Sequence, residues 1–352
     1  MNVTVLYVGS SLLAPLKQAE REINRDYALD LRVAAYNFGA SLADSEWLEV
    51  ERDLSIADVV FVIHVMDGEN AVRLLSALEQ YRAQHRAVVV INCMPGLMRR
   101  TRMGKLDFGR MFGGRAEAAR TEEVSEEGAQ SEGAEKRARH LAGKIGSWMG
   151  EQARAHREKK GRSHTQYLKL VDRLPVILRF VPNAGRLRDI KHYLNLFCYF
   201  LQPTPANIRS MLLYALKGYV PDARASEIKV APPETMPAVA LYHPDAPALF
   251  ESFAAYRKWY ERWEGKSAER KLDSAKTIGL LLMRPQIVSR TRKHYDALIR
   301  AIEAEGLSVL PAISTLMDNR EACEKFFINE VQNPESKVQS LSGDERQQGE
   351  NG

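Results

Sequence analysis

The amino-acid sequence predicts an α/β protein built on a parallel sheet layer of the flavodoxin or Rossmann type. Three observations support this fold class. Near-continuous apolar runs rich in Val and Ile recur along the first hundred residues, and amphipathic helical stretches alternate with them. Turn residues such as Gly9-Ser10-Ser11 and Pro95-Gly96 then end two of the runs. Apolar runs without polar alternation are typical of strands that helices cover on both faces.

The first part of the chain is predicted to contain four strands and three helices. The strands are expected at Val3–Val8, Leu29–Ala35, Asp58–Val65 and Ala87–Ile91. The helices are expected after the first strand as far as about Asn24, then over Asp44–Leu54 and Glu69–Gln84.

Two charged stretches interrupt this pattern. Gly113–Glu135 holds seven Glu among Ala, Gly and Ser, a composition that cannot form a core and predicts a disordered insertion. Lys136–Arg162 is basic and prone to form a helix, with one apolar face that includes Trp148. Such a helix either lies on an anionic membrane surface or docks its apolar stripe on the protein itself.

A helical segment is predicted next. Apolar residues repeat at helical spacing over Leu168–Leu178 and again over Leu187–Leu201. A third helix is expected to begin with Thr204 as N-cap and Pro205 at the first helical position, and to end just before Gly218.

A second α/β unit is predicted after a linker marked by Pro232, Pro233 and Pro237. An aromatic helix face comes first, formed by Leu249, Phe250, Phe253, Tyr256, Tyr260 and Trp263. A strand–helix–strand unit of parallel strands follows at Thr277–Met283, His294–Glu305 and Leu307–Leu310, with Gly306 closing its helix. Further strands to complete a sheet are not apparent, and Ser340–Gly352 is polar and expected to be disordered.

These patterns predict five regions. They are an α/β flavodoxin-like domain at 1–112, a disordered acidic insertion with a basic helix at 113–163, a helical segment at 164–232, the start of a second α/β domain at 233–315 and a polar tail at 316–352.

Composition narrows the class of protein. The chain has 352 residues, of which 45% are hydrophobic and 27% charged, as is ordinary for a globular protein. The net charge is +5, but the basic residues are spread along the chain, which argues against nucleic-acid binding. The three cysteines lack metal-ligand spacing, and Cys93 and Cys198 lie in apolar runs, which favours small buried side chains in a reducing cytoplasm. We find neither a signal peptide nor an apolar stretch near the length of about 20 residues that spans a bilayer.

No motif for catalysis stands out, and the candidate binding residues lie at strand ends. Arg99 and Arg100, followed by Arg102 and Lys105, concentrate positive charge just after the predicted strand Ala87–Ile91. The carboxyl ends of parallel strands form the usual ligand edge of such a sheet. Arg284 follows another strand end, where it either clamps a carboxylate or forms a surface ion pair.

Two histidines and one glycine loop are further candidates, and the sequence leaves their roles open. His64 lies near a strand end and is either a hydrogen-bonded structural residue or part of the ligand edge. His243 lies in a rigid turn, Tyr242–Pro247, and is a candidate ligand contact. Gly9-Ser10-Ser11 either approaches a phosphate or makes a tight turn, but it lacks the P-loop Lys and the spaced glycines of a dinucleotide fingerprint.

Four blocks of sequence, in their order and spacing, resemble the N-terminal part of the large porphyrin-binding subunit of magnesium chelatase. The blocks are Met94–Gly104; Leu170–Pro182 with Asp189, Tyr193, Pro203 and Asn207; Tyr219–Pro221 with Leu241–Pro247; and Ile278–Val288 with His294-Tyr295 and Glu303–Pro311. The large subunit of cobalt chelatase is a weaker match. The acidic insertion and the residues after Glu330 depart from the family pattern.

The resemblance implies a function. The large subunits of this family bind protoporphyrin IX, and two partner subunits, one of them an AAA+ ATPase, couple ATP hydrolysis to Mg²⁺ insertion on the way to chlorophyll or bacteriochlorophyll. The propionates of the porphyrin pair with basic groups, so the resemblance makes Arg99, Arg100, His243 and Arg284 candidate porphyrin contacts. The family's acidic and His chelation residues match no position in this chain, so we assign it no catalytic residue, metal ligand or resident cofactor.

Three hypotheses follow. The chain is an N-terminal portion of the porphyrin-binding subunit, inactive in chelation alone, cytoplasmic and at most peripheral to a membrane. Alternatively, it is a stand-alone tetrapyrrole-binding or assembly module without catalysis. A flavodoxin-like nucleotide binder is disfavoured by the missing phosphate-loop residues.

Overall fold

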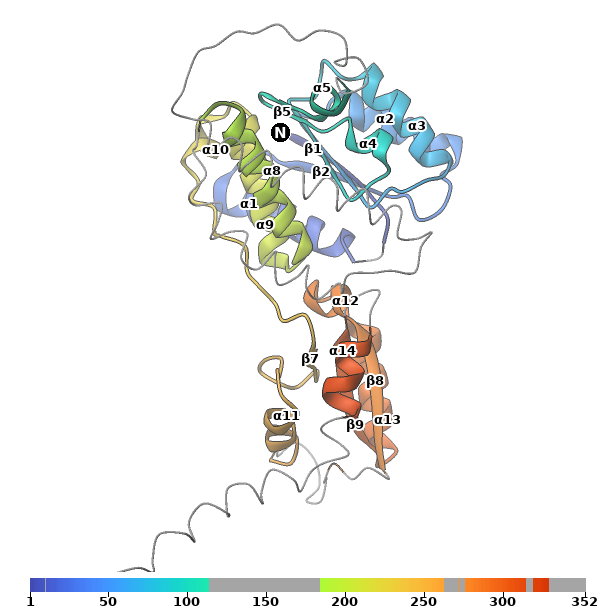
Figure 1. Cartoon of the computed structure of the whole chain (residues 1–352). Coiled ribbons are helices and arrows are strands. Elements are labelled where there is room, and N and C mark those ends of the chain that lie inside the picture. The colour runs from blue at the N-terminus through green and yellow to red at the C-terminus, as the bar shows by residue number, and fades with distance from the viewer. Residues whose placement is uncertain (10, 114–183, 263–271, 273–275, 315–318, 329–352) are drawn as a thin grey trace, which may run out of the picture. The chain divides into compact units, whose positions relative to one another are not determined.

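The computed structural model describes residues 1–9, 11–113, 184–262, 272, 276–314 and 319–328 (Figure 1). The expectations for the acidic insertion from residue 114 on, the basic helix, the helix at 168–178 and the tail from residue 329 on lie outside the described residues. The chain forms two compact units that divide between Thr235 and Met236. The predicted polar tail began at residue 316, but its described part, 319–328, is helical and buries Ala322 and Phe326 in the core of the second unit.

The first unit is built on a mostly parallel sheet. Its strands lie in the order β2-β1-β3-β4-β5-β6. The four parallel strands are β1 (Asn2–Tyr7), β2 (Arg32–Asn37), β3 (Val59–Ile63) and β4 (Ala87–Ile91). Two short antiparallel strands, β5 (Arg102–Met103) and β6 (Leu106–Asp107), extend the β4 edge. The predicted fold class is confirmed.

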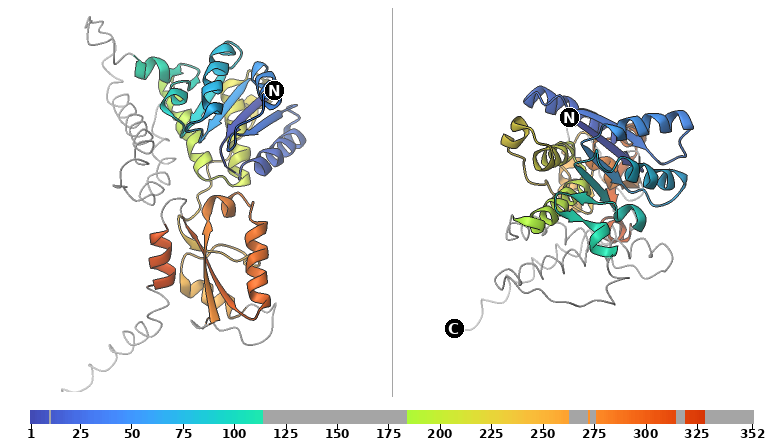
Figure 2. Two further views of the ribbon diagram at one scale, coloured as in Figure 1. Left: turned by 90° about the vertical axis from the view of Figure 1, so that its right-hand side faces the viewer. Right: turned by 90° about the horizontal axis from the view of Figure 1, so that it is seen from above.

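Helices cover both faces of this sheet (Figures 1 and 2). α2 (Asp44–Ser55) and α3 (Glu69–Gln80) pack Trp47 and Leu74 against Val60 and Val62 of the central strand β3. The other face is covered by α1 (Leu13–Tyr27), α8 (Gly185–Leu201) and α9 (Pro205–Tyr219). The helices after residue 184 therefore complete the core of the first unit.

Local sequence explains how α8 and α9 are fixed. Thr204 caps α9, since its hydroxyl accepts the Asn207 N–H at 3.0 Å, and Pro205 occupies the first helical position as predicted. In α8, the buried Tyr193 hydroxyl donates to Val90 O at 2.9 Å and so ties the helix to β4.

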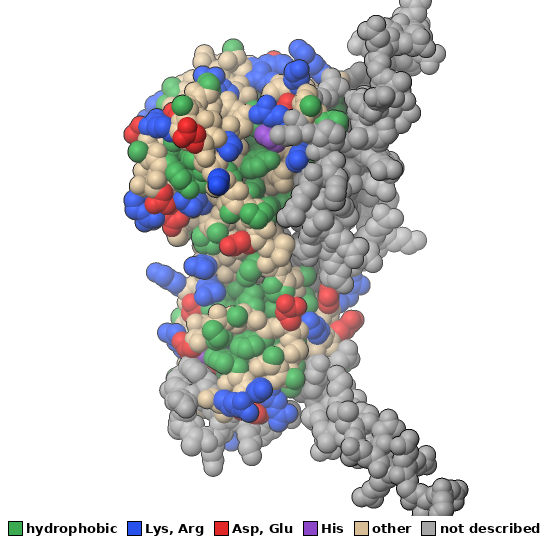
Figure 3. Space-filling view, turned by 90° about the vertical axis from the view of Figure 1, so that its left-hand side faces the viewer, with side chains coloured by type: hydrophobic (Ala, Val, Ile, Leu, Met, Phe, Trp, Pro, Cys, Tyr) green, Lys and Arg blue, Asp and Glu red, His purple; other side chains and the backbone are tan. Residues whose placement is uncertain are grey.

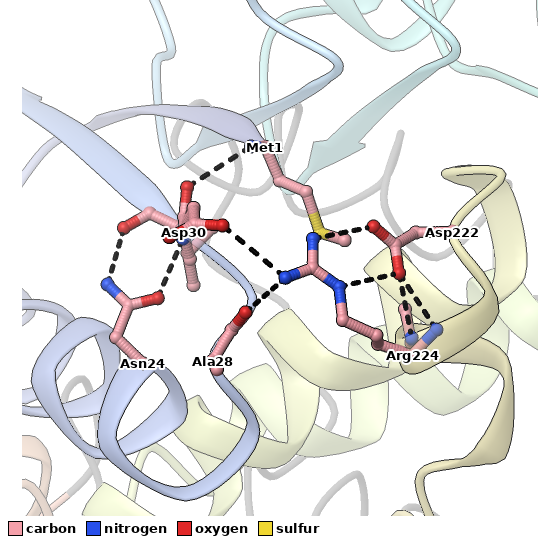
Figure 4. A network of polar contacts seen from close by, with 8 residues as sticks. Met1, Asn24, Ala28, Asp30, Asp222 and Arg224 are labelled. Carbon is pink, nitrogen blue, oxygen red and sulfur yellow. Dashed lines mark hydrogen bonds and ion pairs between the residues drawn. The ribbon is translucent and has the colours of Figure 1, made fainter.

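The second strand starts later than predicted, at Arg32 instead of Leu29. Ala28 and Asp30 adopt left-handed backbone conformations, with φ of 49° and 52°, so the chain turns there rather than extending. Figure 4 shows the contacts that hold this turn. Arg224, from the short helix α10 (Ala223–Glu227), donates to Ala28 O and pairs with both Asp30 and Asp222.

Two helix ends also differ from prediction. α3 stops at Gln80, four residues early, because tight turns at Arg82 and Gln84 bring His85 into the core, where its Nε2 lies 2.8 Å from Leu54 O. α9 continues one residue past Gly218. A Cβ at Gly218 would lie 3.1 Å from His192 Nδ1, so the glycine allows close packing of α8 against α9 rather than ending the helix.

The remaining elements of the first unit are short. α4 (Pro95–Met98) follows β4, and α5 (Phe108–Gly113) follows β6.

The second unit contains a three-stranded sheet in the order β7-β9-β8. β8 (Thr277–Met283) and β9 (Ser308–Ser314) are parallel, as predicted, and α13 (Lys293–Ala304) connects them after the short α12 (Arg284–Val288). The two-residue strand β7 (Ala240–Leu241), which has no counterpart in the sequence prediction, pairs antiparallel with β9. α11 (Phe253–Tyr260), α14 (Arg320–Cys323) and a π-helical turn at Glu324–Ile328 pack around the core.

Candidate functional site

The carboxyl edge of the first sheet is the natural place for a ligand. The strands are added on one side of β1 for β2 and on the other side for β3 and β4, so the switch point of the sheet lies between β1 and β3. Ligands of open α/β sheets bind outside the carboxyl ends of the strands at such a point. The residues that leave β3 and β4 there, His64 and Asn92, both adopt left-handed backbone conformations, with φ of 59° and 51°. Strained backbone of this kind clusters at functional sites.

His64 occupies this edge as a neutral imidazole. Burial lowers the pKa of His64 to about 4, so the ring is uncharged at neutral pH. Its ring meets the edge of Phe200, at the end of α8, with 5.1 Å between centroids. Its backbone N–H donates to Ile91 O at 3.0 Å, and among the described residues its ring makes no hydrogen bond.

Cys93 joins the ends of β3 and β4. Its thiol accepts the Val65 N–H at 3.3 Å and lies 3.3 Å from Ile91 O. Burial raises the pKa of Cys93 to about 12, so the sulfur stays protonated and is a structural group rather than a nucleophile or a metal ligand. This agrees with the interpretation of Cys93 as a small buried side chain.

Arg99 and Arg100 follow α4, which leads the chain back from this edge: Arg102 already pairs with Val88 near the start of β4, and Arg100 lies at the C-terminal end of α3. The two arginines therefore lie toward the amino ends of the strands, and their predicted place at the ligand edge is wrong.

Arg99 is exposed, and among the described residues its side chain makes no ion pair or hydrogen bond. Arg100 is half-buried and pairs with Glu79 of α3. The next arginine is used by the fold, since the Arg102 guanidinium donates to the carbonyls of Arg82 and His85. Arg99 is therefore the arginine of this run that is most available to an anion.

The other two candidates lie inside the second unit. His243 is 1% exposed, and its Nε2 lies 3.2 Å from Glu303 Oε1. Arg284 is 4% exposed and donates to Pro237 O at 2.9 Å and to Met236 O at 2.8 Å. The structure thus brings Arg99 and Arg100 together on one exposed loop, while His243 and Arg284 are engaged by their own unit.

A buried carboxylate supports the loop that carries the arginines. The sequence alone did not mark this residue as part of a site. Asp189 of α8 is 4% exposed and accepts the Lys105 N–H at 2.7 Å and the Tyr219 hydroxyl at 3.0 Å. The turn between β5 and β6 approaches so closely that a Cβ at Gly104 would lie 2.6 Å from Asp189 Oδ2. An acidic residue inside an otherwise apolar helix stripe was the signal that could have identified it.

Surface charge, metal-ligand geometry and helix length add three findings. On the face shown in Figure 3, Lys and Arg side chains are spread over both units among Asp and Glu rather than gathered in one patch. Within the described ranges, no three His, Cys, Asp or Glu side chains converge in a way that could hold a metal ion. None of the helices there is long and apolar enough to cross a membrane.

The architecture defines an α/β protein of the doubly wound class, with a second, smaller α/β unit. Two family models match the chain: the domain of unknown function DUF3479 over residues 2–194, and CobN/Magnesium Chelatase over residues 197–350. The DUF3479 model covers more than half of the chain, so the chain belongs to that family, and its second part is similar to the CobN/magnesium chelatase family.

Individual relatives of the chain are magnesium-chelatase proteins. The chain is 26% identical over 349 residues to the magnesium-chelatase H subunit of Rhodobacter capsulatus, covering 97% of this chain and 25% of that protein. It is 24% identical over 333 residues to the chloroplastic magnesium-chelatase protein ChlH of Oryza sativa, covering 94% of this chain and 22% of that protein. The chain thus spans about a quarter of the length of these relatives and matches their N-terminal portion.

One solved structure is also similar. The catalytic subunit of cobaltochelatase from Mycobacterium tuberculosis matches with a TM-score of 0.36 and 13% identity, covering 92% of this chain and 18% of that one.

Proposed function

We propose that this chain is an N-terminal portion of the porphyrin-binding subunit of a magnesium chelatase, which inserts Mg²⁺ into protoporphyrin IX at the expense of ATP. The observation that carries this proposal is the similarity to magnesium-chelatase relatives over 94–97% of the chain. In this proposal an AAA+ ATPase and a bridging subunit are the partners, the complex works in the cytoplasm, and any membrane contact is peripheral.

The exposed charge of the first unit supports a binding role for this part of the subunit. Arg99, which is exposed, could pair with a porphyrin propionate directly, and Arg100 could do so after leaving Glu79. His243 and Arg284, whose side chains are buried, are proposed to act on the porphyrin indirectly, by shaping the second unit.

A reconstitution experiment tests the proposal. The chain would be mixed with the ATPase and bridging subunits, ATP, Mg²⁺ and protoporphyrin IX, with and without a polypeptide that supplies the remaining three quarters of the porphyrin-binding subunit. We expect Mg-protoporphyrin fluorescence only when that polypeptide is present. Fluorescence from the chain alone would overturn the proposal that this part does not chelate.

The same experiment distinguishes the proposed function from an alternative one. Because the chain corresponds to only a quarter of its relatives, a stand-alone tetrapyrrole-binding module is the second candidate. That module would bind deuteroporphyrin, seen as tryptophan quenching, yet would neither support chelation with the remaining polypeptide nor associate with the ATPase complex.

A further inference from the structure

The most apolar strand of the second unit lies at an open edge of its sheet. β8 pairs with β9 on one side, and within the described ranges no strand pairs with its other side. Its sequence, Thr-Ile-Gly-Leu-Leu-Leu-Met, holds neither a charge nor a proline, and its register with β9 runs without a bulge. Natural sheets protect an exposed edge with exactly such features. The sequence of β8 is therefore that of an inner strand, buried among neighbours.

Exposed apolar side chains border this edge on the α13 side. Leu281 and Met283 of β8 are 41% and 42% exposed. The Met283 N–H donates to the Tyr295 hydroxyl at 3.3 Å, which places this residue of α13 beside the end of β8. Leu298 lies one helical turn after Tyr295 and is 45% exposed. The apolar surface of the strand thus continues onto the helix.

The π-helical turn at Glu324–Ile328 borders the edge on the opposite face. A Cβ at Gly279 would lie 3.2 Å from Phe327 Cε1, so the Phe327 ring packs directly on β8. Ile328, the next residue, is 46% exposed. The left view of Figure 2 shows α13 and this turn, drawn in red, on opposite sides of the strands. We call Leu281, Met283, Leu298 and Ile328, together with the open side of β8, the β8 edge.

Strand order in the first unit shows what kind of strand fits there. In that unit β1, α1 and β2 place β2 on one side of β1, and β3 then pairs parallel with the other side. In the second unit β8, α13 and β9 repeat the first step, and the β8 edge is the position that β3 occupies beside β1. β9 carries Pro311, a residue that sheets tolerate near their margins. The sequence therefore places the margin at β9 and the interior at β8.

We propose that the β8 edge is the docking site for a parallel, apolar β-strand from the remaining three quarters of the porphyrin-binding subunit. The inference rests on the proposed function, because the chain spans only a quarter of its relatives and the rest of such a subunit supplies the strand. The added strand forms main-chain hydrogen bonds along β8 and covers the exposed side chains of the edge. A second copy of this chain fits less well, since two identical edges related by a two-fold axis pair antiparallel.

Hydrogen exchange and a binding titration on the full chain test this docking site. The chain is measured alone and with the polypeptide that supplies the remaining three quarters of the subunit. We expect the amides of residues 278–283 to exchange more slowly in the mixture, while those of β9 do not change. Leu281→Lys should weaken the association by about tenfold or more, because the added strand would bury an unpaired charge. Leu48→Lys makes the same change at an exposed leucine of α2 and is the matched control.

The outcomes separate this inference from the proposed function. Circular dichroism verifies that both variants fold, as expected for exposed positions. Association of the parent chain without protection of residues 278–283, or equal association of the two variants, would overturn the docking site and leave the proposed function standing. A parent chain that fails to associate with the polypeptide would overturn the proposed function and the docking site with it. Protection in the chain alone that rises with its concentration would assign the edge to a second copy instead.

Discussion

His243 and Glu303 form a buried pair inside the second unit, with His243 Nε2 3.2 Å from Glu303 Oε1 and no exposed surface on either side chain. The Asp245 N–H donates to His243 Nδ1 at 3.2 Å, so the ring proton lies on Nε2 and is donated to Glu303. The Tyr260 hydroxyl donates to the same carboxylate oxygen at 2.9 Å. One glutamate of α13 thereby holds both the turn after β7 and helix α11.

Replacing Glu303 by Ala should destabilise the second unit strongly. The substitution removes the acceptor that His243 and Tyr260 share, and each buried donor left without a partner costs about 1–3 kcal/mol. Glu303→Gln keeps an acceptor oxygen and should cost clearly less. Urea unfolding followed by tryptophan fluorescence measures both variants. Equal losses for Ala and Gln would show that the carboxylate oxygen is not what the two donors need.

Gly104→Ala should cost more stability than Gly185→Ala. The two glycines have nearly the same left-handed φ, +55° and +54°. A Cβ at Gly185 meets nothing within 4 Å, so only the backbone strain of about 1–2 kcal/mol applies there. At Gly104 the new methyl group displaces the Asp189 carboxylate from Lys105 N–H and the Tyr219 hydroxyl, which adds about 1–3 kcal/mol.

Thermal unfolding of the two alanine variants gives this comparison directly. Matched melting temperatures would mean that Asp189 can move aside at no cost, and that its two hydrogen bonds contribute little to the first unit.

Stability should fall as the pH drops from about 6.5 to 4. The pKa values of His64 and His192 are both lowered to about 4, chiefly by burial, and at His192 also by the charge of Arg188. Between the folded and the unfolded pKa, the unfolded chain binds more protons, so the free energy of unfolding decreases as the pH falls. Each histidine contributes at most about 1.4 kcal/mol per pH unit.

The variants His64→Gln and His192→Gln isolate this effect. Each should flatten the decline in the unfolding free energy between pH 6.5 and 4, while the dependence above pH 7 stays the same. A decline as steep in both variants as in the parent chain would assign the acid sensitivity to other groups.

The parallel sheet could be predicted from the sequence, because a strand buried on both faces must be continuously apolar. Ala87–Ile91, which is fully buried, was located to the residue for that reason. Thr277–Met283 was also located to the residue because it is continuously apolar, although most of its side chains are half-buried or exposed. The start of β2 was placed three residues early, because a left-handed turn precedes it; Asn24 holds Leu31 there, and Arg224, nearly 200 residues further along the chain, donates to Ala28 O. The strand β7 is too short, at two residues, to leave a pattern.

The site was harder to predict than the fold. The sequence shows that Arg284 follows a strand end. It does not show whether the guanidinium binds a ligand carboxylate or carbonyls of the chain itself. That depends on the path of the linker, whose carbonyls at Met236 and Pro237 accept from Arg284 in the folded chain. His64 was placed at the ligand edge as one alternative, yet its strained backbone and its contact with Phe200 come from packing between distant segments.

Arg99 should contribute more to porphyrin affinity than Arg100, although both were predicted from the same run of charge. Arg99 is exposed and makes no ion pair within the described part of the chain, whereas Arg100 must leave Glu79 to reach a ligand. An exposed ion pair contributes about 0.2–1 kcal/mol, so Arg99→Ala should weaken deuteroporphyrin binding by up to about fivefold at low salt. Tryptophan quenching at low and high salt measures this loss, which should shrink as salt screens the charge. Lys258→Ala removes an exposed charge from α11 and serves as the control, with no change in affinity expected. An affinity that Arg99→Ala leaves unaltered at low salt would remove this loop from the porphyrin site.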